Sequence, residues 1–164
     1  MANEWEICTE IRKRFVESLK SIAEKYKLLM SVDEDICTLV NESYVTFYSP
    51  ELSKHWGITI GADKFIENDG VYFGITQLEY NRPHVTKKQL AEIEHIWEEG
   101  EQESNFPYGW DYLSGEDDCW NDWSDTDTLR DMANGKLCKY IETKIIQPII
   151  ENKLLKRIEE DSSK

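Results

Sequence analysis

The sequence predicts an α+β fold in which a small antiparallel sheet of three or more strands packs against N- and C-terminal helices. Three observations predict it: an apolar stripe of helical period over residues 4–30, three runs rich in β-branched and aromatic residues over residues 44–80, and a return to helical period after residue 124. The 164 residues contain no internal repeat or linker, so we expect a single domain over residues 1–164.

The first expected element is a helix over residues 4–30. Its apolar residues recur at steps of three and four positions, which places them on one helical face. They are Cys8, Ile11, Phe15, Leu19, Ile22, Tyr26 and Leu29. The polar run that begins at Ser31 breaks this pattern, so we expect the helix to end there.

Three strands are expected next, at residues 44–48, 56–61 and 71–80. In the second run, Trp56, Ile58 and Ile60 alternate with small or polar neighbours, which is the period of a strand. Asp69-Gly70 precedes the third run and is a strong signal for a hairpin turn. Glycines inside the runs are expected to mark bulges or a close approach by another element. They are Gly57, Gly61 and Gly74.

A second helix is expected over residues 87–99, and a segment without period follows over residues 101–123. Pro107, Gly109 and Gly115 interrupt any regular structure in that segment. We expect it to form a long aromatic and acidic loop. A loop of this length is uncommon in a compact domain unless it packs or binds something.

Two further helices are expected near the C-terminus. The Ser-Asp pair at residues 124–125 has the composition of an N-cap, which predicts a short helix to Ala133 that ends at the Asn-Gly pair 134–135. A last helix begins near Lys136. Pro148 lies inside it and lacks a main-chain N–H, so we expect a kink or a split there.

The negative charge of the chain is concentrated in its middle. Residues 32–129 carry five basic and twenty-two acidic residues, a balance of −17, whereas the whole chain has a net charge of −14. Between Lys88 and Arg130 there is no lysine or arginine, but there are thirteen carboxylates and four of the six tryptophans. A disordered acidic tail would be poor in aromatic residues. Such a field repels nucleic acid and anionic membranes and attracts basic protein surfaces.

The tryptophans and the carboxylates of this stretch are expected to have different roles. At least two of the tryptophans are expected to pin the aperiodic segment to the sheet, because buried tryptophans would give that segment its only core. They come from the set Trp97, Trp110, Trp120 and Trp123. The carboxylates between them are then forced outward, where a partner would meet them.

No motif in the chain points to catalysis. There is no glycine-rich phosphate-binding motif and no nucleophile elbow, the three histidines stand apart, and the acids of residues 116–127 lack the pattern of a calcium-binding loop. We therefore expect no catalytic residue, no metal site and no cofactor. One string, Glu151-Asn-Lys153, matches half of a metal-dependent nuclease signature, but it follows Pro148 in a segment of helical period.

The location expected from the sequence is cytoplasmic. The first fifteen residues mix acids and bases without an apolar core, which a secretory signal requires. No apolar run approaches the roughly 18 residues of a membrane span. The four cysteines are scattered and form no C-x-x-C pair, unlike a disulfide framework or a zinc site.

A family resemblance involves the aromatic segment and the helices after it. The residues that carry it are Phe106, Pro107, Tyr108, Gly109, Trp110, Trp120, Leu129, Gly135 and Ile141. They resemble the C-terminal region of bacterial and phage restriction-like nucleases of the PD-(D/E)XK type, in which an aromatic turn, a tryptophan and two helices follow a strand pair. The likeness extends back to residues 56–80, about half of the chain. The family's Asp and Glu-x-Lys positions have no counterpart here, so the resemblance implies an accessory module without the catalytic core.

The function expected from these observations is that of a non-catalytic acidic protein that binds a basic protein surface. The most economical partner is a nucleic-acid-binding protein, so the chain would be an inhibitor that mimics nucleic acid charge, encoded by a phage or mobile element against host defence. The partner-binding residues expected are Glu98, Glu99, Glu101, Glu103, Trp110, Tyr112, Glu116, Asp117 and Asp118.

Two alternatives stay open at this point. In one, the chain is a structural or oligomerisation module of a nuclease-like system, whose terminal helices form a homodimer through their apolar faces. In the other, it is a degenerate metal-dependent nuclease that uses Glu151 and Lys153, although its net charge argues against unaided DNA binding.

Overall fold

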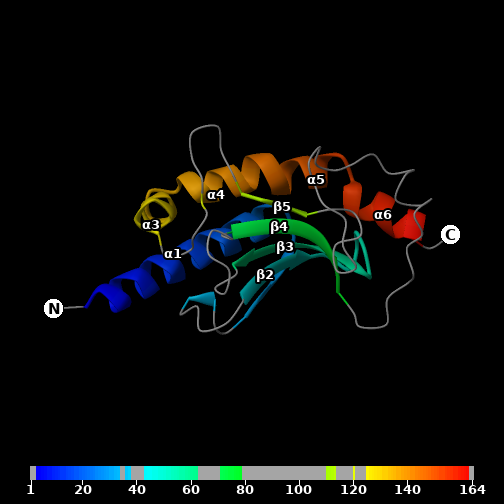
Figure 1. Cartoon of the computed structure of the whole chain (residues 1–164). Coiled ribbons are helices and arrows are strands. Elements are labelled where there is room, and N and C mark those ends of the chain that lie inside the picture. The colour runs from blue at the N-terminus through cyan, green and yellow to red at the C-terminus, as the bar shows by residue number, and fades with distance from the viewer. Residues whose placement is uncertain are drawn as a thin grey trace.

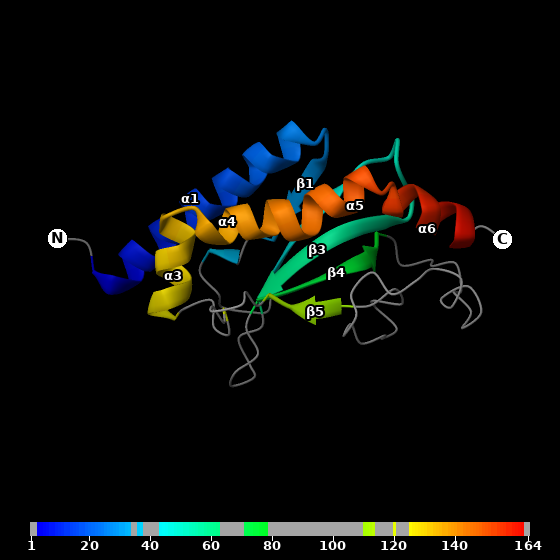
Figure 2. The same ribbon diagram turned by 90° about the horizontal axis from the view of Figure 1, so that it is seen from above.

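The sheet and the terminal helices predicted from the sequence are present. The computed structural model describes residues 3–33, 36–37, 43–62, 71–78, 110–113, 120 and 125–162. Within them, five antiparallel strands form one sheet in the order β1-β2-β3-β4-β5. The helices cover one face of this sheet, as Figure 1 shows from the side and Figure 2 from above. The α+β class is confirmed. The helix expected at residues 87–99 and the loop at 101–123 lie largely outside the described residues.

Helix α1 (Glu4–Lys25) begins with a capping box. The Asn3 side chain accepts a hydrogen bond from the Glu6 N–H, and the Glu6 side chain accepts one from the Asn3 N–H. These bonds satisfy two backbone N–H groups that have no hydrogen-bond partner within the helix. Phe15 and Leu19 of the predicted stripe are fully buried against the sheet.

The end of α1 differs from the prediction, because the helix stops at Lys25 instead of reaching residue 30. Lys27 adopts a left-handed backbone with φ of 57°, and the Leu28 N–H bonds to the Ala23 carbonyl across the turn. This is the Schellman arrangement, in which glycine usually takes the position that Lys27 holds here. Leu29 therefore leaves the helix and starts a strand that the sequence did not predict.

The five strands are consecutive in chain order and pair with their neighbours. They are β1 (Leu29–Val32), β2 (Ser43–Tyr48), β3 (Trp56–Ala62), β4 (Val71–Gln77) and β5 (Trp110–Tyr112). The three strands predicted from alternation are β2, β3 and β4. The predicted Asp69-Gly70 turn between β3 and β4 lies outside the described residues, and the antiparallel pairing of these two strands is confirmed.

Glycines let neighbouring groups come close to the outer face of the sheet, which is the face turned away from the helices. A Cβ on Gly57 would lie 2.8 Å from the carbonyl oxygen of Phe47 in β2. A Cβ on Gly61 would run into the ring of Tyr72 in β4. The close approach predicted for these two glycines is confirmed.

The C-terminal part is a run of short helices. They are α3 (Thr126–Ala133), α4 (Lys136–Ile141), a π-helical turn (Glu142–Ile146), α5 (Gln147–Glu151) and α6 (Leu154–Ser162). Asp125 is the N-cap residue of α3, and the break at Asn134 and Gly135 lies where the sequence predicts it. Gly135 has φ of 84°, a conformation that glycine adopts without strain.

The predicted interruption of the last helix occurs after Pro148, not at it. Pro148 lies in the first turn of α5, where its missing N–H costs least. The π-helical turn comes directly before, and the Gln147 N–H bonds to the Glu142 carbonyl at its end. The chain breaks at Asn152 and Lys153, where Lys153 has φ of 55° and separates α5 from α6.

The apolar faces of the terminal helices form the core together with the inner face of the sheet. Leu19 of α1 and Ile141, Ile145 and Ile158 of the C-terminal run are at most 1% exposed and belong to the same buried cluster as Phe47 of β2. These faces are buried within the chain. The homodimer that one sequence-based alternative forms through them stays a prediction. None of the helices in the described part is long and apolar enough to span a membrane.

Candidate partner-binding site

Four aromatic side chains form a continuous row on the outer face of the sheet near β5. Neighbouring ring centroids are 6.3 Å apart for Tyr44 and Tyr72, 6.2 Å for Tyr72 and Trp110, and 5.0 Å for Trp110 and Tyr112. Each pair meets edge to face, with interplanar angles of 76° to 88°. We call these four residues the aromatic row.

The strand register explains why these rings meet. Tyr72 of β4 lies opposite Tyr112 of β5, and Trp110 lies opposite Gly74, which has no side chain to compete for the space. Tyr44 and Tyr72 are both paired with Gly61 of β3, one from each side. The row ends at Tyr112, which is 36% exposed, so its ring is accessible to a partner.

The backbone of Val71 holds the chain on both sides of residues 114–119, which we call the acidic segment. The Leu113 N–H donates to the Val71 carbonyl at 2.8 Å, and the Val71 N–H donates to the Trp120 carbonyl at 3.1 Å. Glu116, Asp117 and Asp118 lie in the acidic segment. Leu113 and Trp120, the residues on either side of the acidic segment, are therefore both bonded to Val71 at the start of β4.

Trp120, the residue that follows the acidic segment, is buried inside the protein. Its side chain is 2% exposed and meets the Tyr140 ring edge to face, with centroids 4.9 Å apart. Its indole N–H donates to the buried Asp131 carboxylate at 2.8 Å, and Arg130 also donates to that carboxylate. Burial alone raises the pKa of Asp131, but the hydrogen bonds from Trp120 and Arg130 outweigh it and hold the pKa below its ordinary value.

The two aromatic site residues predicted from the sequence lie together on β5. Trp110 is half-buried and Tyr112 is exposed. Trp120 pins its segment to the body, as predicted, whereas Trp97 and Trp123 lie outside the described residues. The seven carboxylates predicted as site residues also lie outside the described residues. They are Glu98, Glu99, Glu101, Glu103, Glu116, Asp117 and Asp118. Sequence reasoning missed Tyr44 and Tyr72, because alternation gives their face but not the strand register that brings them to Trp110.

A second polar cluster joins α6 to the residues before β3. The Glu159 carboxylate accepts a hydrogen bond from the Ser53 hydroxyl at 2.8 Å and lies 2.7 Å from His55 Nδ1. In a catalytic triad the histidine must contact the serine and serve as its base. Here the carboxylate stands between the two, so the cluster is a tether and not an activated nucleophile.

This tether predicts a pH-dependent stability. Burial raises the pKa of Glu159, but hydrogen bonds from Ser53 and His55 lower it more, so the pKa lies below 4.5 in the folded protein. The stabilisation is complete above the unfolded pKa and is lost as the pH falls through the lowered one. We expect Glu159→Gln to flatten this part of the acid-unfolding curve, measured by circular dichroism in urea. Glu160→Gln, one residue on and exposed, is the control, and equal curves for the two variants would contradict the prediction.

The Glu-x-Lys string lies on a helix end instead of a strand. Glu151 is the last residue of α5, is exposed, and accepts a hydrogen bond from Gln147 at 2.8 Å. Lys153 lies in the break after α5. The nuclease signature needs a strand that presents both side chains to a metal ion. In the part of the chain that the structure describes, no group of three histidine, cysteine or carboxylate side chains is placed to hold a metal.

No family model, no curated protein and no solved structure matches this chain. The resemblance to the accessory region of restriction-like nucleases therefore stays a prediction.

Proposed function

We propose that this chain is a non-catalytic acidic binding protein that covers a basic surface on a partner protein. The contact surface would combine the acidic segment with the exposed end of the aromatic row. The observation that carries the proposal is the double attachment to Val71, because it brings together Leu113 and Trp120, the residues on either side of the acidic segment. Fixed flanking residues reduce the conformational entropy that a partner must remove on binding.

The distribution of charge along the chain supports the same contact surface. The stretch between Lys88 and Arg130 contains no basic residue to neutralise its thirteen carboxylates. Four of these, at residues 98–103, precede Trp110 by seven to twelve positions, and three more lie in the acidic segment. A field of one sign steers an oppositely charged protein toward the surface and repels the phosphates of nucleic acid.

The aromatic row complements the carboxylates. Lysine and arginine side chains bind the faces of tyrosine and tryptophan rings as well as carboxylates. Tyr112, exposed at the end of the row, offers such a face. Proteins that bind nucleic acid concentrate lysine and arginine on one surface. We therefore propose that the partner is a nucleic-acid-binding protein and that this chain inhibits it. The chain would be encoded by a phage or mobile element.

The test measures binding of a fluorescent peptide rich in lysine and arginine, with labelled double-stranded DNA in parallel. We expect the peptide to bind, with an affinity that falls as salt is raised, and the DNA not to bind. Reversing three charges, with Glu116→Lys, Asp117→Lys and Asp118→Lys, is expected to weaken peptide binding by about tenfold or more, because these carboxylates supply the contact.

A matched control variant separates the effect of charge at this surface from the effect of net charge on the whole protein. Glu51→Lys, Glu151→Lys and Glu160→Lys make the same change of net charge at exposed positions elsewhere on the protein. We expect the control variant to keep most of its affinity. An equal loss in both variants, or no peptide binding at low salt, would contradict the proposal.

A further inference from the structure

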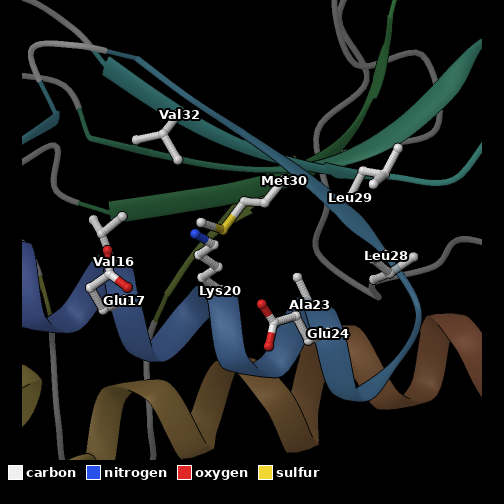
Figure 3. A pocket seen from close by; sticks show the side chains of 9 residues that line it. All are labelled: Val16, Glu17, Lys20, Ala23, Glu24, Leu28, Leu29, Met30 and Val32. Carbon is white, nitrogen blue, oxygen red and sulfur yellow. The ribbon is translucent and has the colours of Figure 1, made fainter.

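An apolar groove of about 500 Å³ lies between α1 and β1, at the sheet edge opposite to β5. Figure 3 shows its lining, with Met30 directly above Lys20 and with Val32 toward the end where Glu17 lies. Val32 is 39% exposed and Leu29 is 52% exposed, which is high for apolar residues of a strand. Among the described strands, β1 pairs only with β2, so no described strand occupies its other edge.

The hydrogen-bonding groups on the open edge can be assigned from the ladder. The Asp33 N–H donates to the Tyr44 carbonyl of β2, so the main-chain groups of Asp33 point toward β2. These directions alternate along an antiparallel strand. Ser31 therefore also points toward β2, whereas the N–H and C=O groups of Met30 and Val32 point outward. An incoming strand would bond to these two residues.

The flank of α1 beside this edge carries a row of alternating charges. Lys13, Glu17, Lys20 and Glu24 follow one another at steps of four, three and four residues, and all four side chains are exposed. The last three line the groove. Within the described part of the chain, none of the four side chains forms an ion pair.

The charges of this row are complementary to those of a second, antiparallel copy of the same row. If a second α1 runs antiparallel, with the symmetry axis midway between residues 17 and 20, Glu17 meets Lys20 of the second copy and Lys13 meets its Glu24. Four opposite-charge pairs result, and no like-charge pair. Such self-complementarity is what a two-fold symmetric interface requires.

The strand and the helix place that axis at the same point. An axis through Ser31 sets Met30 of one copy opposite Val32 of the other, and these are the two residues whose main-chain groups point outward. In the groove, Met30 lies over Lys20 and Val32 lies toward Glu17 (Figure 3). The midpoint between Met30 and Val32 therefore falls close to the midpoint between Lys20 and Glu17. One symmetry operation therefore satisfies the strand bonds and the helix charges together.

We propose that two copies of this chain associate through β1, joining their sheets into one antiparallel sheet of ten strands with the α1 flanks facing each other. Met30 and Val32 would exchange main-chain hydrogen bonds between the copies and pair their side chains over the groove. This interface lies at the opposite edge of the sheet from β5, so it is independent of the acidic segment and of the function proposed above.

The first test measures the dimer dissociation constant by sedimentation equilibrium at physiological ionic strength, where repulsion between the net charges is screened beyond about 8 Å. Val32→Pro removes an N–H that points outward and leaves the ladder with β2 intact. Because the bond is lost twice in a symmetric dimer, we expect the dissociation constant to rise about thirtyfold. The thermal unfolding midpoint of the diluted monomer, measured in parallel, should change little.

A charge swap tests the proposed register. Glu17→Lys alone and Lys20→Glu alone each create two like-charge contacts across the axis, so each should weaken the dimer. The double variant Glu17→Lys/Lys20→Glu restores opposite charges and should regain the wild-type dissociation constant. Failure of the double variant to recover would overturn this register.

Amide hydrogen exchange gives a readout for each residue. The amides of Met30 and Val32 should exchange more slowly as the protein concentration rises, whereas the Ser31 amide, already bonded within the sheet, should not change. A protein that stays monomeric at every concentration would overturn the proposal. So would a dimer that Val32→Pro leaves intact.

Discussion

Replacing Trp120 with alanine is expected to lower the free energy of unfolding by about 3–5 kcal/mol, the usual cost of removing a large aromatic side chain from a core. Trp120 is 2% exposed, packs against Tyr140, and donates its indole N–H to Asp131. The substitution leaves a cavity and takes a donor from a buried carboxylate. Urea unfolding followed by circular dichroism measures the loss.

Two further variants separate the causes of that loss. Trp120→Phe keeps most of the ring volume but removes the N–H, so it should cost about 1–3 kcal/mol. Tyr112→Ala removes an exposed ring and should cost about 1 kcal/mol or less, while weakening the peptide binding proposed above. A Trp120→Ala protein as stable as Tyr112→Ala would show that the acidic segment is not held in the way we describe.

Replacing Gly57 with valine is expected to cost about 3 kcal/mol, or to prevent folding. The new Cβ would lie 2.8 Å from the main-chain oxygen of Phe47, and that oxygen cannot move without shifting β2. Overpacking of this kind strains the sheet at its centre, because β3 has a partner strand on both sides. Thermal and urea unfolding of the purified variant measure the effect.

A glycine in open space supplies the control for Gly57. Gly135 has no atom within 4 Å of the place where a Cβ would stand, but its φ is 84°. Gly135→Ala should therefore cost only the strain of a left-handed residue, about 1 kcal/mol. Gly57→Val no less stable than Gly135→Ala would contradict the close approach between β2 and β3.

The sequence predicts most elements of this fold and misses the two short strands, β1 and β5, for identifiable reasons. Alternation at Trp56, Ile58 and Ile60 is sufficient to recognise β3. Strand β5 has only three residues and lies in a segment without period, so no pattern marks it. Leu29 follows Tyr26 at a helical spacing, and only the left-handed turn at Lys27 takes it out of the helix. A lysine at that position gives no warning of the turn.

The candidate site is predictable only in part for a related reason. Burial of a tryptophan can be inferred, because an aperiodic segment needs some core, and Trp120 fulfils that expectation. Its partner Asp131 cannot be inferred, since a carboxylate eleven residues away is normally exposed. The same holds for Tyr72, whose contact with Trp110 depends on how two distant strands align.

The π-helical turn at Glu142–Ile146 affects how the C-terminal run tolerates changes in its length. A π turn holds one residue more than the α turn it replaces, so α4 and α5 keep the phase of a continuous helix that is one residue shorter. Ile141 before the turn and Ile149 after it both face the core. Thr143 lies between them and is exposed. A chain without this residue could close the turn into regular α-helix and keep the same buried faces, so loss of a single residue is neutral to the packing at this one point of the run.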